Sequence, residues 1–234
     1  MSKIPVGLQL YTVRDWTEKD FAGTVRKVAE MGYVGVEFAG YGGLSAEAMK
    51  ELLEETGLKP AGSHVAMPLM EEDLDGVISY NQTIGNPYVG VPWMATELRT
   101  PSGFREVAKK MNVWGKAYAE AGIKLYYHNH NFEFEKMDGA IGWEILLNET
   151  DPELVSFETD VYWMRYAGYD AGEFIKRYAD RIALVHLKDM TGEGDDRTFA
   201  EVGEGITDFA PIFVASEVSA AEWYIVEQDR CAGS

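Results

Sequence analysis

IKLYYHNHNFEF, residues 123–134, starts as an apolar, β-rich run and turns polar at His128. Three more apolar runs that end near a histidine or an acidic residue follow towards the C-terminus. The three further runs are LVSFETD at 154–160, IALVHLK at 182–188 and WYIVE at 223–227. The spacing between successive runs leaves room for one helix and two loops, which indicates strand–helix units in series.

The N-terminal half of the chain repeats the same unit. Its predicted strands are VGLQLY at 6–11, VGVEFA at 34–39, KPAGSHV at 59–65 and YVGVPW at 88–93. A helical segment follows each of the first seven strands. The segment SAEAMKELLEET at 45–56 shows the signals most clearly, because Ser45 is a favourable N-cap and Gly57 a favourable C-terminal stop.

Strict alternation of strands and helices predicts an α/β protein with a parallel sheet. Strands that are apolar throughout, in eight regular units, predict a closed (β/α)8 TIM barrel. A doubly wound sheet is the alternative, but eight units within 234 residues favour closure. We expect one domain over residues 1–234, because no linker or shift in composition divides the chain.

The eighth unit of the predicted barrel is incomplete. The sequence stops at CAGS soon after the eighth strand, so we expect a barrel that lacks the eighth, C-terminal helix. The outer faces of the first and eighth strands would then expose apolar surface, which favours association into a homo-oligomer.

Composition narrows the classes of partner. The formal net charge is −18, which disfavours nucleic acid as a partner. Cys231 is the only cysteine, which excludes an intrachain disulfide and a cysteine-based zinc cluster. No apolar run approaches the length of a membrane span and the N-terminus does not read as a signal peptide, so we expect a soluble cytoplasmic protein.

The four residues that end the last four strands predict a metal site. In a parallel barrel the C-terminal ends of all strands meet at one mouth. His128, Asp160, His186 and Glu227 would bring nitrogen and oxygen donors together there, as a divalent metal such as Mn²⁺, Mg²⁺, Co²⁺ or Zn²⁺ requires. Taken singly, each has a structural alternative, such as a hydrogen-bonded core histidine or a helix-capping aspartate.

Other residues at strand ends are candidates for contact with a substrate. His130 shares a strand face with His128, and His64 ends the third strand. Glu37 could accept sugar hydroxyls and Trp93 could pack on a sugar ring, although a structural carboxylate and a core-edge aromatic are equally good interpretations. The sequence contains no phosphate-loop lysine motif and no nucleophile elbow.

Eight motifs together resemble the xylose isomerase-like barrel superfamily, which includes sugar isomerases and epimerases, inosose dehydratase and endonuclease IV. The resemblance covers nearly the whole chain, and its YHNH, HLKD and VEQD segments are most similar to inosose dehydratases and to sugar phosphate isomerase/epimerase relatives. The motifs are GLQLYTVRD, VGVEFAG, GSHV, YHNHNFEF, TDVYW, VHLKDM, VGEGITDF and YIVEQD.

The resemblance implies that Asp160, His186 and Glu227 hold a metal. The epimerases of the superfamily carry a glutamate on the fifth strand, where this chain has His128, and a further histidine where it has Trp163. Their two glutamates shuttle protons, so the familiar pair of bases is altered here. Glu133 could replace the fifth-strand glutamate only if its loop folds back.

We therefore expect a metal-dependent sugar or sugar phosphate isomerase or epimerase that works through an enediolate. The metal would polarise a carbonyl and its neighbouring hydroxyl, and Glu227 or His128 would remove a carbon-bound proton. The alternatives are a lyase of the inosose dehydratase type acting on a keto-polyol, with Lys188 or His64 protonating the leaving group, and a sugar-binding barrel with altered catalysis. A DNA-repair activity fits the charge least.

Overall fold

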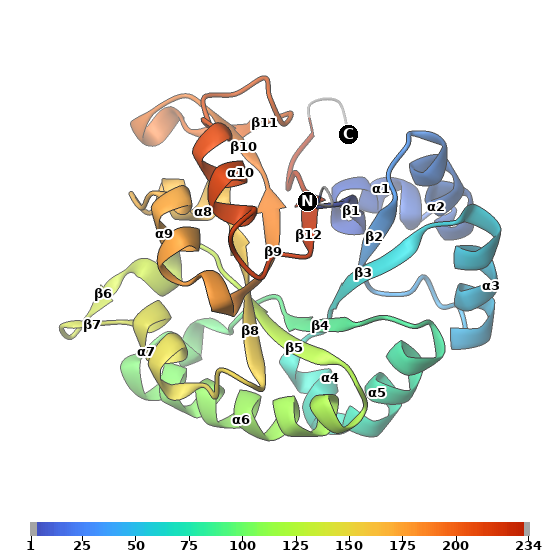
Figure 1. Ribbon diagram of the computed structural model, residues 1–234, viewed down its shortest axis with the longest axis horizontal. Helices are drawn as coiled ribbons and strands as arrows, with labels where there is room; N and C mark the ends of the chain where they lie inside the picture. The colour runs from blue at the N-terminus through green and yellow to red at the C-terminus, as the bar shows by residue number, and fades with distance from the viewer. Residues whose placement is uncertain (1–3, 232–234) are drawn as a thin grey trace.

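Eight parallel strands close into a barrel in the computed structural model, which describes residues 4–231 (Figure 1). This confirms the predicted α/β barrel with all eight of its strands and rules out the doubly wound sheet. In hydrogen-bonding order the strands are β1 (Val6–Gln9), β12 (Trp223–Val226), β9 (Ile182–Leu187), β8 (Val155–Asp160), β5 (Lys124–His128), β4 (Tyr88–Val91), β3 (Lys59–His64) and β2 (Gly35–Ala39), which pairs with β1.

Helices surround the barrel, as Figure 1 shows. Their sequence signals act as predicted: the Ser45 hydroxyl accepts a hydrogen bond from the Ala48 amide, and Gly57 ends the helix with φ of 72°. The α-helices are α1 (Arg14–Thr17), α2 (Phe21–Glu30), α3 (Ala46–Thr56), α4 (Met67–Glu72), α5 (Leu74–Thr83), α6 (Pro101–Glu120), α7 (Gly142–Glu149), α8 (Val161–Tyr166), α9 (Ala171–Arg177) and α10 (Ala210–Ser216).

Two segments differ from the sequence-based expectation. The first strand ends at Gln9 instead of residue 11, because the Gln9 side chain accepts a hydrogen bond from the Tyr11 amide and opens the 3-10 helix η1 (Leu10–Val13). The second difference is an antiparallel hairpin of β10 (Asp189–Thr191) and β11 (Thr198–Ala200), which lies between β9 and α10 where no strand is predicted.

The remaining short elements lie in loops. Two strands pair as a second antiparallel hairpin after β5, and four further 3-10 helices connect larger elements. They are β6 (Lys136–Met137), β7 (Ala140–Ile141), η2 (Thr96–Leu98), η3 (Phe132–Phe134), η4 (Ala179–Arg181) and η5 (Gly194–Asp196).

Within residues 4–231 no helix follows β12. The apolar surface left bare is smaller than expected. Val6 at the start of β1 is 39% exposed, but Leu8 on the same strand is buried in a cluster that includes residues of α2 and α3. Tyr224 of β12 is covered by Phe213 of α10, with ring centroids 5.2 Å apart. Association into a homo-oligomer stays a prediction.

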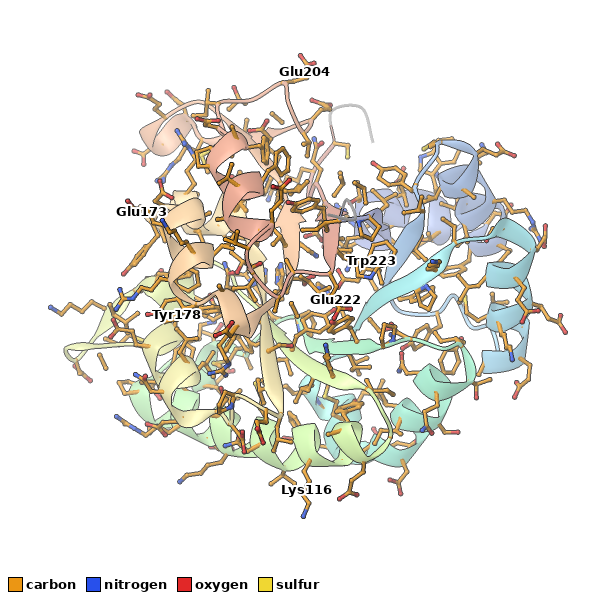
Figure 2. All side chains as sticks on the ribbon, viewed as in Figure 1. Lys116, Glu173, Tyr178, Glu204, Glu222 and Trp223 are labelled. Carbon is orange, nitrogen blue, oxygen red and sulfur yellow. The ribbon has the colours of Figure 1, made fainter. Side chains whose placement is uncertain are left out.

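Side chains fill the inside of the barrel in levels, because alternate residues of each strand point inwards. The lowest level is apolar, and it contains Tyr88, Tyr126, Leu184 and Trp223. Polar residues take over towards the C-terminal ends of the strands. Figure 2 shows Trp223 near the middle of the molecule, whereas Lys116 of α6 points outwards.

Inward-facing glycines make room for the large aromatic side chains, as small barrels require. Gly90 of β4 lies beside Tyr126 of β5, its partner in strand register. A Cβ atom on Gly90 would overlap the Tyr126 ring. Since that ring is fully buried, it has no free space into which it can move.

We expect Gly90→Ala to destabilise the protein by about 1–3 kcal/mol through overpacking. Urea unfolding measures the loss. The double variant Gly90→Ala/Tyr126→Leu should be less destabilised than the sum of the single variants, because the smaller side chain relieves the overlap. Additive effects in this cycle would show that the Tyr126 ring is not the obstacle.

Candidate active site

The four predicted metal ligands converge at the mouth of the barrel. Each contributes one nitrogen or oxygen atom, and the four atoms lie within 4.8 Å of one another. The inward alternation along the strands explains the convergence, because Asp160 ends β8, His186 lies on β9 and Glu227 follows β12. We call His128, Asp160, His186 and Glu227 the mouth cluster.

The spacing within the mouth cluster fits a tetrahedral cation site. His186 Nδ1 lies 3.0 Å from Glu227 Oε2 and 3.7 Å from Asp160 Oδ2. His128 Nε2 lies 3.4 Å from the same Asp160 oxygen. Ligands about 2.0–2.2 Å from a tetrahedral Zn²⁺ are about 3.4 Å from each other, so the observed separations require little adjustment.

His128 provides an independent sign that the mouth cluster suits a cation. The residue is buried, and within residues 4–231 neither of its ring nitrogens makes a hydrogen bond, although Nε2 lies 3.4 Å from Asp160 Oδ2. An unsatisfied buried imidazole is costly, and a metal ligand bond would satisfy one of its nitrogens. The residues present therefore fit a divalent metal.

Asp160 serves two purposes at once. Its Oδ1 accepts a hydrogen bond from the Trp163 amide at 3.0 Å and caps helix α8. Its Oδ2 faces the mouth cluster. The helix-cap interpretation and the ligand interpretation of this residue are thus compatible, and the cap fixes the orientation of the carboxylate.

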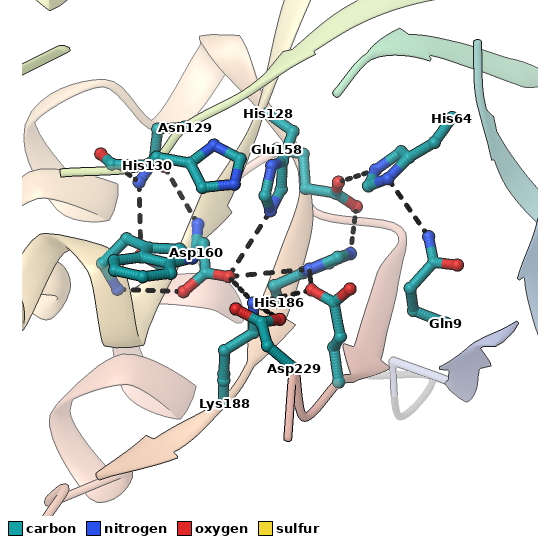
Figure 3. A network of polar contacts seen from close by, with 12 residues as sticks. Gln9, His64, His128, Asn129, His130, Glu158, Asp160, His186, Lys188 and Asp229 are labelled. Atoms are coloured by element: carbon teal, nitrogen blue, oxygen red, sulfur yellow. Dashed lines mark hydrogen bonds and ion pairs between the residues drawn. The ribbon is translucent and has the colours of Figure 1, made fainter. Parts of the chain in front are cut away.

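Lys188 lies among the carboxylates of the mouth cluster, as Figure 3 shows. Its Nζ is 2.9 Å from Asp160 Oδ2, 2.7 Å from Glu227 Oε2 and 2.8 Å from Asp229 Oδ1. Lys188 is among the residues predicted from the sequence, whereas Asp229 is not. The VEQD motif contains that signal, because Asp229 stands two residues after Glu227 and so recurs with the strand period.

A second polar group lies deeper in the barrel. Glu158 and Glu37 are fully buried, and the His64 ring nitrogen Nε2 lies 2.9 Å from Glu158 Oε2. Glu37 accepts hydrogen bonds from the Gln9 amide and from the Tyr126 hydroxyl. We call Gln9, Glu37, His64, Tyr126 and Glu158 the inner network.

His186 joins the mouth cluster to the inner network. Its Nε2 lies 2.8 Å from Glu37 Oε2 and 3.1 Å from Glu158 Oε1, while its Nδ1 faces the mouth cluster. A carboxylate that accepts the proton of one ring nitrogen leaves the other nitrogen available as a ligand. Sequence reasoning missed Glu158, although its position two residues before Asp160 places it on the same strand face.

Burial and neighbouring charges shift the pKa values of Glu227 and His186 in opposite directions. Burial alone would raise the pKa of Glu227, but the charges of Lys188 and His186 hold that pKa well below its usual range. Burial alone would lower the pKa of His186, yet Glu158, Glu37 and Glu227 raise it well above its usual value. The site therefore holds ionised carboxylates and a protonated His186.

The pKa of His130 is shifted in the opposite direction to that of His186. Burial lowers the pKa of its imidazole well below the usual value, and the charges of His128 and Lys188 lower it further. His130 is therefore neutral near pH 7. Its ring also meets the ring of Trp93 edge-on, with centroids 4.6 Å apart.

A cavity of about 710 Å³ opens above the mouth cluster. Of the predicted substrate-binding residues, His64, Trp93 and His130 line this cavity. Trp93 is 49% exposed, so its ring is available to a ligand. Glu37 lies in the inner network below, and its contact with a substrate stays a prediction. The other lining residues include Tyr11, Arg14, His128, Trp163, Lys188, Phe199, Glu227, Asp229 and Arg230.

Glu133 does not take the place of a fifth-strand glutamate. The loop after β5 does turn back, but Glu133 Oε2 accepts a hydrogen bond from the His130 amide at 2.8 Å. Its Oε1 accepts a hydrogen bond from the Tyr127 hydroxyl at 2.9 Å. The carboxyl group thus supports the loop that carries His130 and is absent from the residues that line the described cavity.

The fold and the site together define the class of protein. The family model described as "Xylose isomerase-like TIM barrel" matches residues 25–230, and the chain belongs to this family. The inosose dehydratase of Geobacillus kaustophilus is 27% identical in an alignment of length 263 that covers 92% of this chain and 85% of that relative.

Solved structures show the same fold. A sugar phosphate isomerase/epimerase from Parabacteroides distasonis superposes with a TM-score of 0.83 at 23% identity, covering 100% of this chain and 89% of that one. The IOLI protein, whose structure contains a zinc atom, has a TM-score of 0.76 at 14% identity, covering 97% and 89% of the two chains.

Among the helices formed by residues 4–231, none combines the length and the apolar character needed to cross a membrane. The longest of them, α6, has polar and charged residues along one side.

Glu133 predicts a pH dependence of stability. Burial raises the pKa of its carboxyl group from 4.5 to about 8. Between these values the folded protein binds more protons at Glu133 than the unfolded chain, so its contribution to stability decreases as the pH rises from 4.5 to about 8. Glu133→Gln should flatten this part of the profile of unfolding free energy against pH.

Urea unfolding at several pH values measures the profile. Glu135→Gln is a matched control, because Glu135 is exposed and only two residues away. An unchanged slope in Glu133→Gln would contradict the account of this buried carboxyl group.

Proposed function

We propose that this protein is a divalent-metal-dependent isomerase or epimerase that acts on a sugar or a cyclic polyol through an enediolate. The observation that carries the proposal is the mouth cluster, in which two imidazoles and two carboxylates place donor atoms within 4.8 Å of one another. Membership in the xylose isomerase-like family and the likeness to sugar isomerases and epimerases support it.

His128, Asp160, His186 and Glu227 would hold the metal. A divalent cation in this position supplies a Lewis acid that polarises a carbonyl and the neighbouring hydroxyl of the substrate. His186 is oriented for this role by Glu37 and Glu158. The helix cap formed by Asp160 holds its carboxylate in place.

Proton-transfer groups lie on two walls of the cavity. Glu227 and Lys188 come from β12 and β9, which are neighbours in the barrel. His64 and His130 come from β3 and the end of β5, across the barrel from β12. Glu227 is the proposed base, and a neutral His130 can exchange a proton on the other wall. Groups on both walls allow a proton to be returned to a different carbon or to the opposite face.

The exposed ring of Trp93 supports a carbohydrate-like substrate. Sugars and cyclic polyols present C–H groups that pack on aromatic rings and hydroxyls that need polar partners. The cavity offers both, since Trp163 and Phe199 add aromatic surface and His64 and Asp229 add polar atoms.

A lyase of the inosose dehydratase type is the second candidate. The favouring observation is the Lys188 ammonium group, which lies 2.7 Å from Glu227 Oε2. A base and an acid side by side can remove a proton and protonate a departing hydroxyl in one site. The similarity to the inosose dehydratase of G. kaustophilus supports the same chemistry.

Solvent exchange tests the step that both candidates share. Incubation of keto-sugars and keto-polyols in D₂O should place deuterium on the carbon next to the carbonyl, as measured by NMR. Glu227→Gln should slow this exchange by about 10²–10⁴-fold if Glu227 is the base. An α-diketone absorption band in the ultraviolet would identify the lyase, whereas a rearranged sugar would identify the isomerase or epimerase.

Elemental analysis tests the metal requirement. We expect the purified protein to contain about one divalent metal ion per chain, and Asp160→Ala and Glu227→Ala to lose most of it because each removes one ligand. Glu153→Ala, a change at an exposed carboxylate, is the control. The same metal content in all four proteins would rule out the mouth cluster as the site.

Glu158 provides a test of the inner network. Because its carboxylate faces the Nε2 of His186, Glu158→Gln should weaken metal binding by about 10–100-fold while leaving all four ligands in place. Calorimetric titration with Mn²⁺ measures the change, and Glu153→Gln is the matched control. An affinity equal to that of the unmodified protein would show that the inner network does not tune His186.

A further inference from the structure

Lys188 contacts the same carboxylate oxygens that a bound metal would need as ligands. Its Nζ lies 2.9 Å from Asp160 Oδ2 and 2.7 Å from Glu227 Oε2, both members of the mouth cluster. The side chain is only 1% exposed, so solvent does not screen its charge. An ammonium group and a divalent cation that share these oxygens repel each other strongly at such short range.

We propose that Lys188 is a built-in competitor of the divalent cation, and that Asp229 receives the lysine ammonium group when the cation binds. The inference rests on the proposed function, because it requires the mouth cluster to bind a metal. It adds a role for two residues that are not themselves among the four ligands.

Asp229 is placed to receive the ammonium group. Its Oδ1 already lies 2.8 Å from Lys188 Nζ, and the residue is outside the mouth cluster. A small rotation of the flexible lysine side chain can therefore release Asp160 and Glu227 while it keeps one ion pair. Figure 3 shows Lys188 and Asp229 side by side beneath Asp160.

The exchange has a consequence for the reaction. Lys188 and Asp229 both line the cavity above the mouth cluster. When the ammonium group leaves the ligand oxygens, its protons become available to a substrate in that cavity. Binding of the cation and presentation of the lysine as a proton donor would then be coupled events, since the first causes the second.

Metal affinity tests the competition directly. Chelator-stripped protein would be titrated with Mn²⁺ by calorimetry, and Lys188→Met should bind at least tenfold more tightly than the unmodified protein. Lys124→Met is the matched control, because Lys124 pairs with Glu222 at the N-terminal ends of the strands and its loss changes the net charge by the same amount. Its Mn²⁺ affinity should match that of the unmodified protein.

Asp229→Asn tests the second half of the proposal. In the unmodified background it should weaken Mn²⁺ binding, because the ammonium group loses its alternative partner. In the Lys188→Met background the effect of Asp229→Asn should be at least threefold smaller, which a double-mutant cycle measures. An effect of equal size in both backgrounds would overturn the assignment of Asp229 as the receiving group.

Lys188→Gln is a second variant in case Lys188→Met folds poorly. It removes the charge of Lys188 but keeps polar hydrogens among the carboxylates. Its melting temperature with and without Mn²⁺ provides a second measure, and the rise on adding Mn²⁺ should exceed that of the unmodified protein. If the unmodified protein binds Mn²⁺ and neither Lys188 variant binds it more tightly, the competition is refuted while the metal site stands. If none of the proteins binds Mn²⁺, the metal site and this inference are both refuted.

Discussion

His186 stands between two pairs of buried carboxylates, and most of the site depends on this arrangement. Its Nε2 faces Glu37 and Glu158 below, and its Nδ1 faces Asp160 and Glu227 above. Carboxylates removed from water are stable only when opposite charge or hydrogen bonds compensate them. His186 contributes to that compensation on both sides, together with Lys188 above and His64 below. The four carboxylates around His186 fix the orientation of its ring.

The barrel explains how such a concentration of charge can exist inside a protein. Alternate side chains of each strand point inwards, so Leu184, His186 and Lys188 lie in ascending order along β9 and its extension. The lower level is closed by aromatic residues such as Tyr126 and Trp223. This apolar base keeps water from the inner network on one side, and the cavity admits a substrate on the other.

Much of the fold and part of the site could be predicted from the sequence. The eight apolar runs predicted the strands because a barrel strand is buried on both faces. Asp160, His186 and Glu227 could be recognised because they are polar residues at or near the ends of such runs. Glu158 was harder to recognise because it lies within a strand, where its partners come from strands distant in the sequence. Glu37 was placed at the mouth in the sequence analysis, whereas the register with Gly62 and Gln9 sets it one level lower.

Short-range contacts were the least predictable part. The end of β1 at Gln9 depends on one side chain that accepts a hydrogen bond from the Tyr11 amide, and local propensity does not show such a bond. The pairing of Lys188 with Asp229 joins the ends of β9 and β12, so only the closed barrel reveals it.

His128 stands where the sequence resemblance implies a fifth-strand glutamate, and the charges around His128 bear on this difference. The carboxylates of the mouth cluster are those of Asp160 and Glu227, whose two negative charges would balance one divalent cation bound between them. Asp229 then balances Lys188. A glutamate in place of His128 would add a further negative charge to a site that already buries Glu37 and Glu158, and another cation would have to compensate it. The charges of His128, Lys188 and Asp229 are therefore compatible with one another: an imidazole on β5 adds no negative charge beside the Lys188–Asp229 ion pair.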